Sequence, residues 1–171
     1  PNSVQWYVEY YTFKEVAILK LIYSDMLPIQ LNDGQQSIVD CLKEHFAIAS
    51  EVEIAVGYVS KAALLELDNW VEEMNISRIC LTIGMYYIEG MPESSYRTAL
   101  SLNKKWMSKG IGEIRMVKAF KYHGKTYCFY KDGKPCAAVI GSANLGVMKL
   151  EASNRRQFEA AVVTADVDEC A

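Results

Sequence analysis

The chain has 171 residues, of which 51% are hydrophobic and 23% are charged. This length is typical of one domain with a single buried core, and the composition excludes a disordered chain. No apolar run reaches the roughly 18 residues needed to cross a bilayer, and no basic and apolar series typical of a signal peptide opens the chain. We therefore expect a cytoplasmic protein with no membrane partner.

The five cysteines are scattered and include no Cys-x-x-Cys pair. Their odd number favours reduced thiols in the cytoplasm. Cys128 and Cys136 could face each other across a hairpin, but we expect no disulfide there because of the compartment. With two histidines and no cysteine pair, the chain offers no usual zinc ligand set, so neither a metal nor another cofactor is expected.

The net charge of -3 hides an uneven distribution. Acidic residues are in excess before residue 100 and basic residues after it, and Glu113 is the one acid in the basic stretch 104–125. Such a stretch fits a surface for a polyanion such as nucleic acid, although a solvated lysine face gives the same pattern. The candidate phosphate contacts are Lys104, Lys105, Lys118, Lys121, Arg155 and Arg156.

In chain order, the first element is β-rich: residues 4–23 favour one or two strands, with a helix as the alternative. A helix follows, because apolar residues recur at helical spacing over 38–46. Residues 51–59 alternate as a strand. Ser60 then suits the N-cap of an amphipathic helix that extends to residue 75.

The second part of the chain continues this alternation. Gly110 closes a helix at the position where glycine adopts a left-handed conformation at little cost, and Asp132-Gly133 marks a hairpin turn. The expected elements are a strand at 78–83, a helix at 94–108, strands at 113–117, 126–130 and 136–140, and a last strand at 158–163. The order predicts an α/β fold with a mixed sheet flanked by helices on both faces and later strands partly antiparallel.

The densest cluster of polar side chains is His123-Gly124-Lys125, then Gly141-Ser142-Ala143-Asn144, then Glu159. In an extended segment His123 and Lys125 project from the same face, so they can address one phosphate. The Gly-Ser-Ala-Asn turn follows a buried strand, at the edge where open α/β sheets place their ligands. Glu159 lies amid apolar strand residues, where a lone buried charge is costly, so it needs a partner.

His-x-Lys followed by Gly-Ser-x-Asn resembles the signature of the phospholipase D superfamily. The run 120–145 is most similar to the restriction endonucleases of that superfamily, the NgoFVII and BfiI types. One position departs from the pattern: the superfamily's aspartate falls at Tyr130, and Asp132 lies in the expected turn. Several nuclease branches also lack this aspartate, so the departure points away from lipases.

The resemblance implies that His123 is the nucleophile and forms a covalent phosphohistidine that water later hydrolyses. Glu159 would hydrogen-bond this histidine and hold its other ring nitrogen toward phosphorus, with Glu151 as the alternative carboxylate. The residues that would bind the non-bridging oxygens and stabilise the transition state are Lys125, Asn144 and, as a weaker candidate, Ser142.

A double displacement needs a second group to protonate the leaving oxygen. Two-copy members of the superfamily use a second histidine for this, but His45 is not followed by a motif lysine, so this chain has one copy. We therefore expect a homodimer that brings His123 of each subunit to a shared site.

The resulting hypothesis is that residues 1–171 form a phospholipase D-like catalytic domain: a metal-independent DNA endonuclease of a type II restriction enzyme. Because no DNA reader is evident, we expect the chain to be part of a longer protein with a separate recognition domain. The alternatives are a phospholipase D-like enzyme that acts on lipids, and a nucleic-acid-binding module without turnover.

Overall fold

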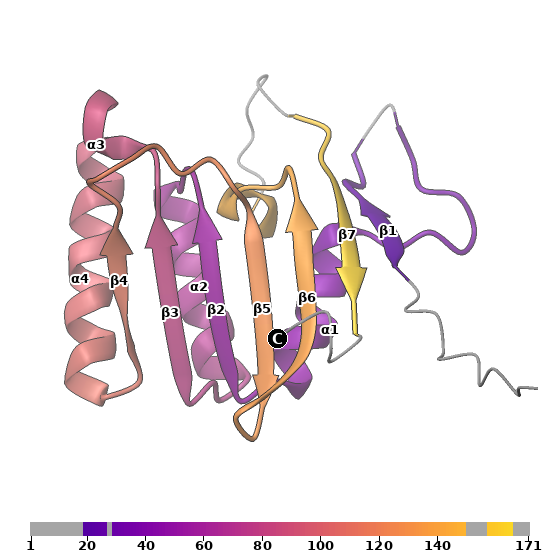
Figure 1. Cartoon of the computed structure of the whole chain (residues 1–171), viewed down its shortest axis with the longest axis horizontal. Coiled ribbons are helices and arrows are strands. Elements are labelled where there is room, and N and C mark those ends of the chain that lie inside the picture. The colour runs from indigo at the N-terminus through magenta and orange to yellow at the C-terminus, as the bar shows by residue number, and fades with distance from the viewer. Residues whose placement is uncertain (1–18, 27–28, 150–156, 166–171) are drawn as a thin grey trace, which may run out of the picture.

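The computed structural model describes residues 19–26, 29–149 and 157–165. Its strands are β1 (Lys20–Tyr23), β2 (Glu51–Val56), β3 (Arg78–Ile83), β4 (Gly112–Met116), β5 (Thr126–Lys131), β6 (Lys134–Gly141) and β7 (Ala160–Thr164). They form one seven-stranded sheet in the order β1-β7-β6-β5-β2-β3-β4 (Figure 1). The pairs β2–β3 and β3–β4 are parallel, whereas the other neighbours are antiparallel. The expected mixed sheet is confirmed.

The helices are α1 (Ile38–Ile48), α2 (Lys61–Glu73), α3 (Tyr86–Glu89) and α4 (Glu93–Lys109), with a 3₁₀ helix η1 (Leu145–Met148). Two of them begin at serine caps: Ser37 accepts from the backbone N–H of Asp40, and Ser60 from that of Ala63. Gly110 ends α4 with a φ of 69°, as expected. No described helix is long and apolar enough to cross a membrane.

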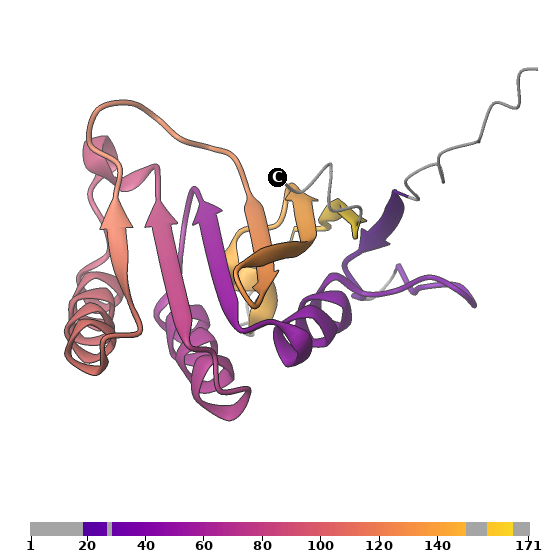
Figure 2. The same cartoon turned by 60° about the horizontal axis from the view of Figure 1, so that its bottom comes forward.

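The described helices α1, α2 and α4 gather on one face of the sheet (Figure 2), where the sequence led us to expect helices on both faces. The strands alternate accordingly. Val52 and Ile54 of β2 are buried against the helices, while Glu53 between them is exposed on the other face. A second helical layer would bury such charged residues, so the alternation fits a sheet with one open face. The α/β class is confirmed, with this correction to the layers.

The core lies between the sheet and the helices and is rich in aromatic side chains. Phe46 of α1 packs edge-on against Trp70 of α2, with ring centroids 5.3 Å apart. A polar contact joins α2 to α4: the buried Asp68 accepts from Trp106 Nε1 at 2.9 Å and from Lys105 Nζ at 2.5 Å. The two helices are therefore fixed by a charged hydrogen-bonded group as well as by apolar packing.

The β5–β6 hairpin keeps its two cysteines apart. Cys128 pairs in register with Ala138, while Cys136 falls at a β-bulge and its thiol contacts the carbonyl oxygen of Phe129. Both are free thiols. The expectation of no disulfide between them is confirmed.

One edge of the sheet collects the chain segments that carry the chemical motif. The carboxyl ends of β2, β3, β4 and β6 meet there with the start of β5 (Figure 1). Two backbone bonds tie the β4–β5 connection to the end of β3: Val117 N–H donates to Ile83 O (2.9 Å) and Tyr122 N–H to Gly84 O (3.1 Å). This connection delivers His123 to the edge.

Candidate active site

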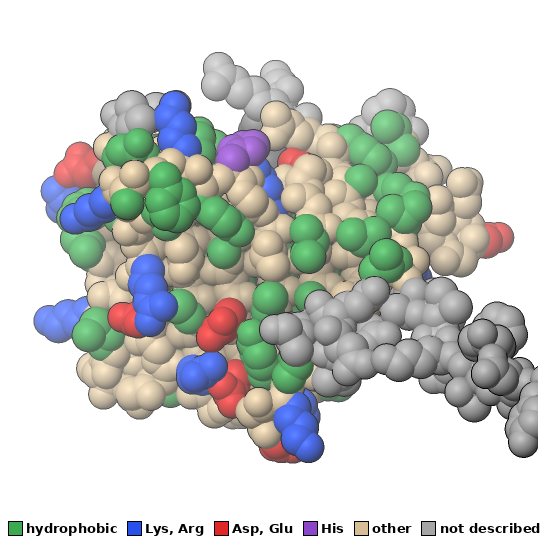
Figure 3. Space-filling model, viewed as in Figure 1, with side chains coloured by type: hydrophobic (Ala, Val, Ile, Leu, Met, Phe, Trp, Pro, Cys, Tyr) green, Lys and Arg blue, Asp and Glu red, His purple; other side chains and the backbone are tan. Residues whose placement is uncertain are grey.

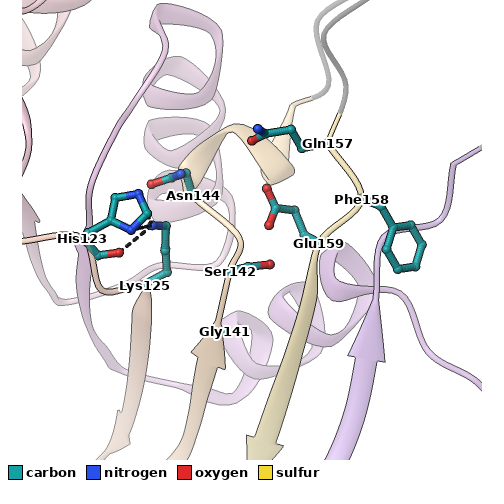
Figure 4. Close-up of a pocket in the computed structure, with 8 residues that line it drawn as sticks. All are labelled: His123, Lys125, Gly141, Ser142, Asn144, Gln157, Phe158 and Glu159. Carbon is teal, nitrogen blue, oxygen red and sulfur yellow. Dashed lines mark hydrogen bonds between the residues drawn. The ribbon is translucent and has the colours of Figure 1, made fainter.

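A pocket of about 720 Å³ opens at this edge of the sheet (Figure 4). Its walls come from the segment before β5, the turn after β6 and the segment before β7. The lining residues are His123, Lys125, Gly141, Ser142, Asn144, Gln157, Phe158 and Glu159. The structure thus brings together all five residues that the sequence proposed as catalytic.

His123 and Lys125 contact each other inside the pocket. Lys125 Nζ lies 3.0 Å from His123 Nδ1 and 3.1 Å from Nε2, and it donates to the histidine carbonyl oxygen at 2.5 Å (Figure 4). The lysine is only 5% exposed, whereas the histidine is exposed. Burial lowers the pKa of Lys125, and the charge of Glu159 opposes that shift. An ammonium group is thereby held beside an accessible imidazole.

The side chain of Asn144 is oriented by the loop after β2. Its Oδ1 accepts from the backbone N–H of Tyr58 at 3.0 Å. Because a backbone N–H can only donate, this contact assigns the oxygen to the loop and leaves the Nδ2 donors for the pocket. Gly57 gives the site room, since an added Cβ would stand 3.5 Å from both Asn144 Oδ1 and His123 Cδ2.

The Gly-Ser-Ala-Asn turn is fixed from beneath and from the side. Tyr127 is buried in β5, and its hydroxyl donates to the carbonyl oxygen of Ala143 at 2.9 Å. Ser142 Oγ donates to Ala160 O at 3.3 Å and accepts from Ala160 N at 3.1 Å. The serine hydroxyl already uses its proton, so it holds β6 to β7 beside Glu159 more directly than it could hold a phosphate.

Glu159 enters the pocket from the other side. Its backbone is fixed by Ser24, whose hydroxyl accepts from Glu159 N at 3.0 Å and whose N–H donates to Glu159 O at 2.9 Å. The carboxylate points into the pocket, and among the residues drawn in Figure 4 no hydrogen bond joins it to His123. The expected carboxylate–histidine bond is thus not made in this structure, and the electrostatic link of Glu159 runs to Lys125.

The candidate phosphate contacts are divided by the fold. Lys118 and Lys121 are exposed in the connection that leads to the pocket. Lys104 and Lys105 lie near the end of α4, which runs away from the pocket edge (Figure 1). Lys105 is also engaged in ion pairs with Asp68 and Glu72 of α2 at 2.5 and 2.9 Å. The remaining candidates, Arg155, Arg156 and the alternative carboxylate Glu151, lie outside the described residues.

The other histidine of the chain does not line the pocket. His45 lies on α1 and packs against Phe129, with ring centroids 5.3 Å apart. Burial lowers its pKa, and its Nδ1 has no hydrogen-bond partner among the described residues. It is a core residue, as its place on a helix face indicated. Tyr130 and Asp132 lie near the hairpin tip, at the opposite end of β5 from the pocket.

Two lining residues were not foreseen. Gln157 and Phe158 precede Glu159, and the ring of Phe158 stacks with Tyr23 at a centroid distance of 6.3 Å. Nothing in their types marks them, although their place next to Glu159 could have included them. Among the described residues, no group of three or more His, Cys, Asp or Glu side chains is placed to hold a metal ion.

The comparison with protein-family models gives a match over residues 36–171. The matching family is the NgoFVII restriction endonuclease N-terminal PLD domain, where PLD stands for phospholipase D. The chain belongs to this family. The expected resemblance is therefore confirmed, and this PLD domain is a member of a family of phosphodiester-acting nucleases. No curated protein matches it.

Two solved structures share the fold of this PLD domain. Phosphatidylserine synthase of Haemophilus influenzae Rd KW20 is 13% identical, with a TM-score of 0.57 over 92% of this chain and 36% of that one. Polyphosphate kinase of Porphyromonas gingivalis is 18% identical, with a TM-score of 0.50 over 90% of this chain and 24% of that one. The PLD domain thus spans about a quarter to a third of the length of these proteins. The likeness shows the fold.

Proposed function

We propose that this PLD domain is a metal-independent DNA endonuclease that works through a phosphohistidine intermediate. The observation that carries the proposal is the convergence in one pocket of an accessible imidazole, a buried ammonium and an amide donor: His123, Lys125 and Asn144. This set supplies a nucleophile and two kinds of donor for the oxygens of one phosphodiester. The restriction endonuclease family favours DNA as the substrate.

The contact between Lys125 and His123 gives the first step a physical description. In the free site, the ammonium lies beside both ring nitrogens and holds the imidazole in place. A bound phosphate offers the ammonium a charged acceptor, which forms a stronger hydrogen bond than a neutral ring nitrogen does. Lys125 then moves its bond to a non-bridging oxygen, and a ring nitrogen of His123 becomes free to attack phosphorus.

In the proposed chemistry, a bond forms between His123 nitrogen and phosphorus while the bond from phosphorus to the leaving oxygen breaks. The leaving oxygen takes a proton from a general acid. Water then attacks phosphorus, the nitrogen–phosphorus bond breaks, and the histidine returns to its free state. Lys125 and Asn144 Nδ2 stabilise the charge on the equatorial oxygens in both steps.

The general acid is the part that one copy of the pocket does not supply. His45 is held in the core, and the other described histidine is the nucleophile itself. We therefore place His123 of the partner subunit in this role, in a homodimer whose two pockets join into one site. The pocket is open, which leaves a side on which a second copy can lie.

Cleavage in a metal chelator tests the proposed chemistry. Since histidine and not a metal activates the phosphodiester, the protein should cleave plasmid DNA at an undiminished rate in excess EDTA. A denaturing gel of the quenched reaction should show a protein-bound phosphate that is stable to alkali and lost in acid. Activity that disappears in EDTA and returns with Mg²⁺ would overturn the mechanism.

A further inference from the structure

The connection from β4 to β5 forms a short arch above the carboxyl end of β3. Its ends are the two backbone bonds described above, from Val117 to Ile83 and from Tyr122 to Gly84. Gly84 is needed for the second bond, because an added Cβ would collide with the carbonyl oxygen of Tyr122. Since His123 follows Tyr122 directly, the position of the arch relative to the proposed nucleophile is fixed.

The four residues between these bonds, Lys118, Ala119, Phe120 and Lys121, are all exposed. The ring-bearing side chain of Phe120 is 59% exposed. Neither lysine forms an ion pair with another residue in the described part of the chain. Figure 3 shows positive and hydrophobic side chains close to the histidine at this edge of the molecule.

We propose that this arch, residues 118–121, holds a nucleic-acid strand beside the scissile phosphate. Phe120 stacks on an unpaired base, and Lys118 and Lys121 bind phosphates of the same strand. The inference rests on the proposed function, because it adds a strand-binding surface to that same site.

The composition and the spacing of the arch support this assignment. One exposed aromatic residue is ordinary on a protein surface, but an aromatic ring between two cations without ion-pair partners is the arrangement of surfaces that bind single strands. Three residues of chain span at most about 10 Å, and nucleotides in one strand of a duplex follow each other at about 3.4 Å of rise. The two lysines therefore reach different phosphates of one strand.

The stacking part makes a claim about the form of the substrate. In a duplex, both faces of a base are covered by its neighbours, so Phe120 can stack only where a base has left the helix or the strand is single. The arch thus assigns to the domain a preference for single-stranded or locally opened DNA next to the cleaved bond. Lys118 and Lys121 alone would bind either form, because they address the backbone.

Binding of two matched oligomers to the purified protein tests the arch. One probe is a fluorescein-labelled single-stranded oligo(dT), and the other is an abasic oligomer with the same number of phosphates. Phe120→Ala should weaken binding of oligo(dT) about tenfold and leave binding of the abasic oligomer within about twofold, whereas Phe120→Trp should bind oligo(dT) at least as tightly as the parent. Lys118→Gln should weaken both probes and lower the salt dependence by about one counterion.

The controls lie at the opposite edge of the sheet. Ile48→Ala removes an apolar side chain that is 54% exposed, and Lys134→Gln removes an exposed charge at the hairpin tip; both should bind the two probes as the parent does. If Phe120→Ala weakens both probes equally or neither, the arch is not a stacking surface. If the parent protein neither binds nor cleaves DNA, the proposed function itself fails, and the two failures are thus distinguished.

Discussion

His123 and Lys125 are within hydrogen-bond distance of each other but have different tasks in the proposed mechanism. His123→Ala should lower cleavage by more than about a thousandfold and change DNA affinity little, because a nucleophile contributes mainly in the transition state. Lys125→Ala should lower both, since the ammonium binds the phosphate before and during the reaction. Single-turnover rates and binding by fluorescence anisotropy measure the two effects separately. Wild-type turnover by His123→Ala would remove this histidine from the mechanism.

Asn144 offers a change of almost no volume. Asn144→Asp keeps the oxygen that accepts from Tyr58 N–H but replaces the two Nδ2 donors by a second oxygen with negative charge. The protein should fold normally, while cleavage should fall by about a hundredfold or more. The melting temperature and the cleavage rate of the same preparation give the comparison. A variant with unchanged cleavage would mean that the amide does not face the phosphate.

The residues of the pocket were accessible from the sequence to different degrees. The spacing of His123, Lys125 and Asn144 predicted their convergence, because strand geometry and a following turn fix where such residues lie. The task of the Ser142 hydroxyl was not accessible, since it depends on which strand pairs with β6. The bond expected between Glu159 and His123 is absent for a similar reason: the orientation of that carboxylate is set by side chains from three separate segments.

At the scale of elements, the contact between α2 and α4 accounts for part of the basic stretch. Asp68→Ala should destabilise the protein by about 1–3 kcal/mol, because it leaves the buried Trp106 N–H and the Lys105 ammonium without their acceptor. Thermal or urea unfolding followed by circular dichroism measures this.

A matched control for the Asp68 variant is available on α4. Glu93→Ala breaks an ion pair with Arg97 in which both side chains are about three-quarters exposed, and it should cost at most about 0.5 kcal/mol. If the two variants lose equal stability, the contact between α2 and α4 is no more than a surface ion pair.

The elements with a local signal were predicted, and those set by their neighbours were not. Ser60 and Gly110 begin and end helices as expected, because capping depends on a few adjacent residues. The one-turn helix α3 carries no periodicity, since it is too short to show one. The open face of the sheet was legible in the alternation of Glu51 to Val56, but the βαβ order of the chain suggested a doubly covered sheet.

At the scale of the whole molecule, one motif in each chain decides between two kinds of enzyme. A dimer of one wild-type and one His123→Ala subunit should lose nearly all multiple-turnover cleavage if the two histidines share a site as nucleophile and acid. Independent sites would keep about half of the activity. Mixed dimers purified through two different affinity tags can be assayed beside both parents. Half activity would mean that each chain has its own acid.

The β5–β6 hairpin divides the pocket along the chain. His123 and Lys125 come before its turn, and Asn144 and Glu159 come after it, while the turn itself, with positive φ at Asp132 and Gly133, lies at the far end of the two strands from the pocket (Figure 1). New chain ends placed in this turn would therefore leave the lining of the pocket intact. Neither fragment could bind and attack a phosphodiester alone. Fused to two interacting proteins, the pair would form a split enzyme whose DNA cleavage reports that the proteins have met.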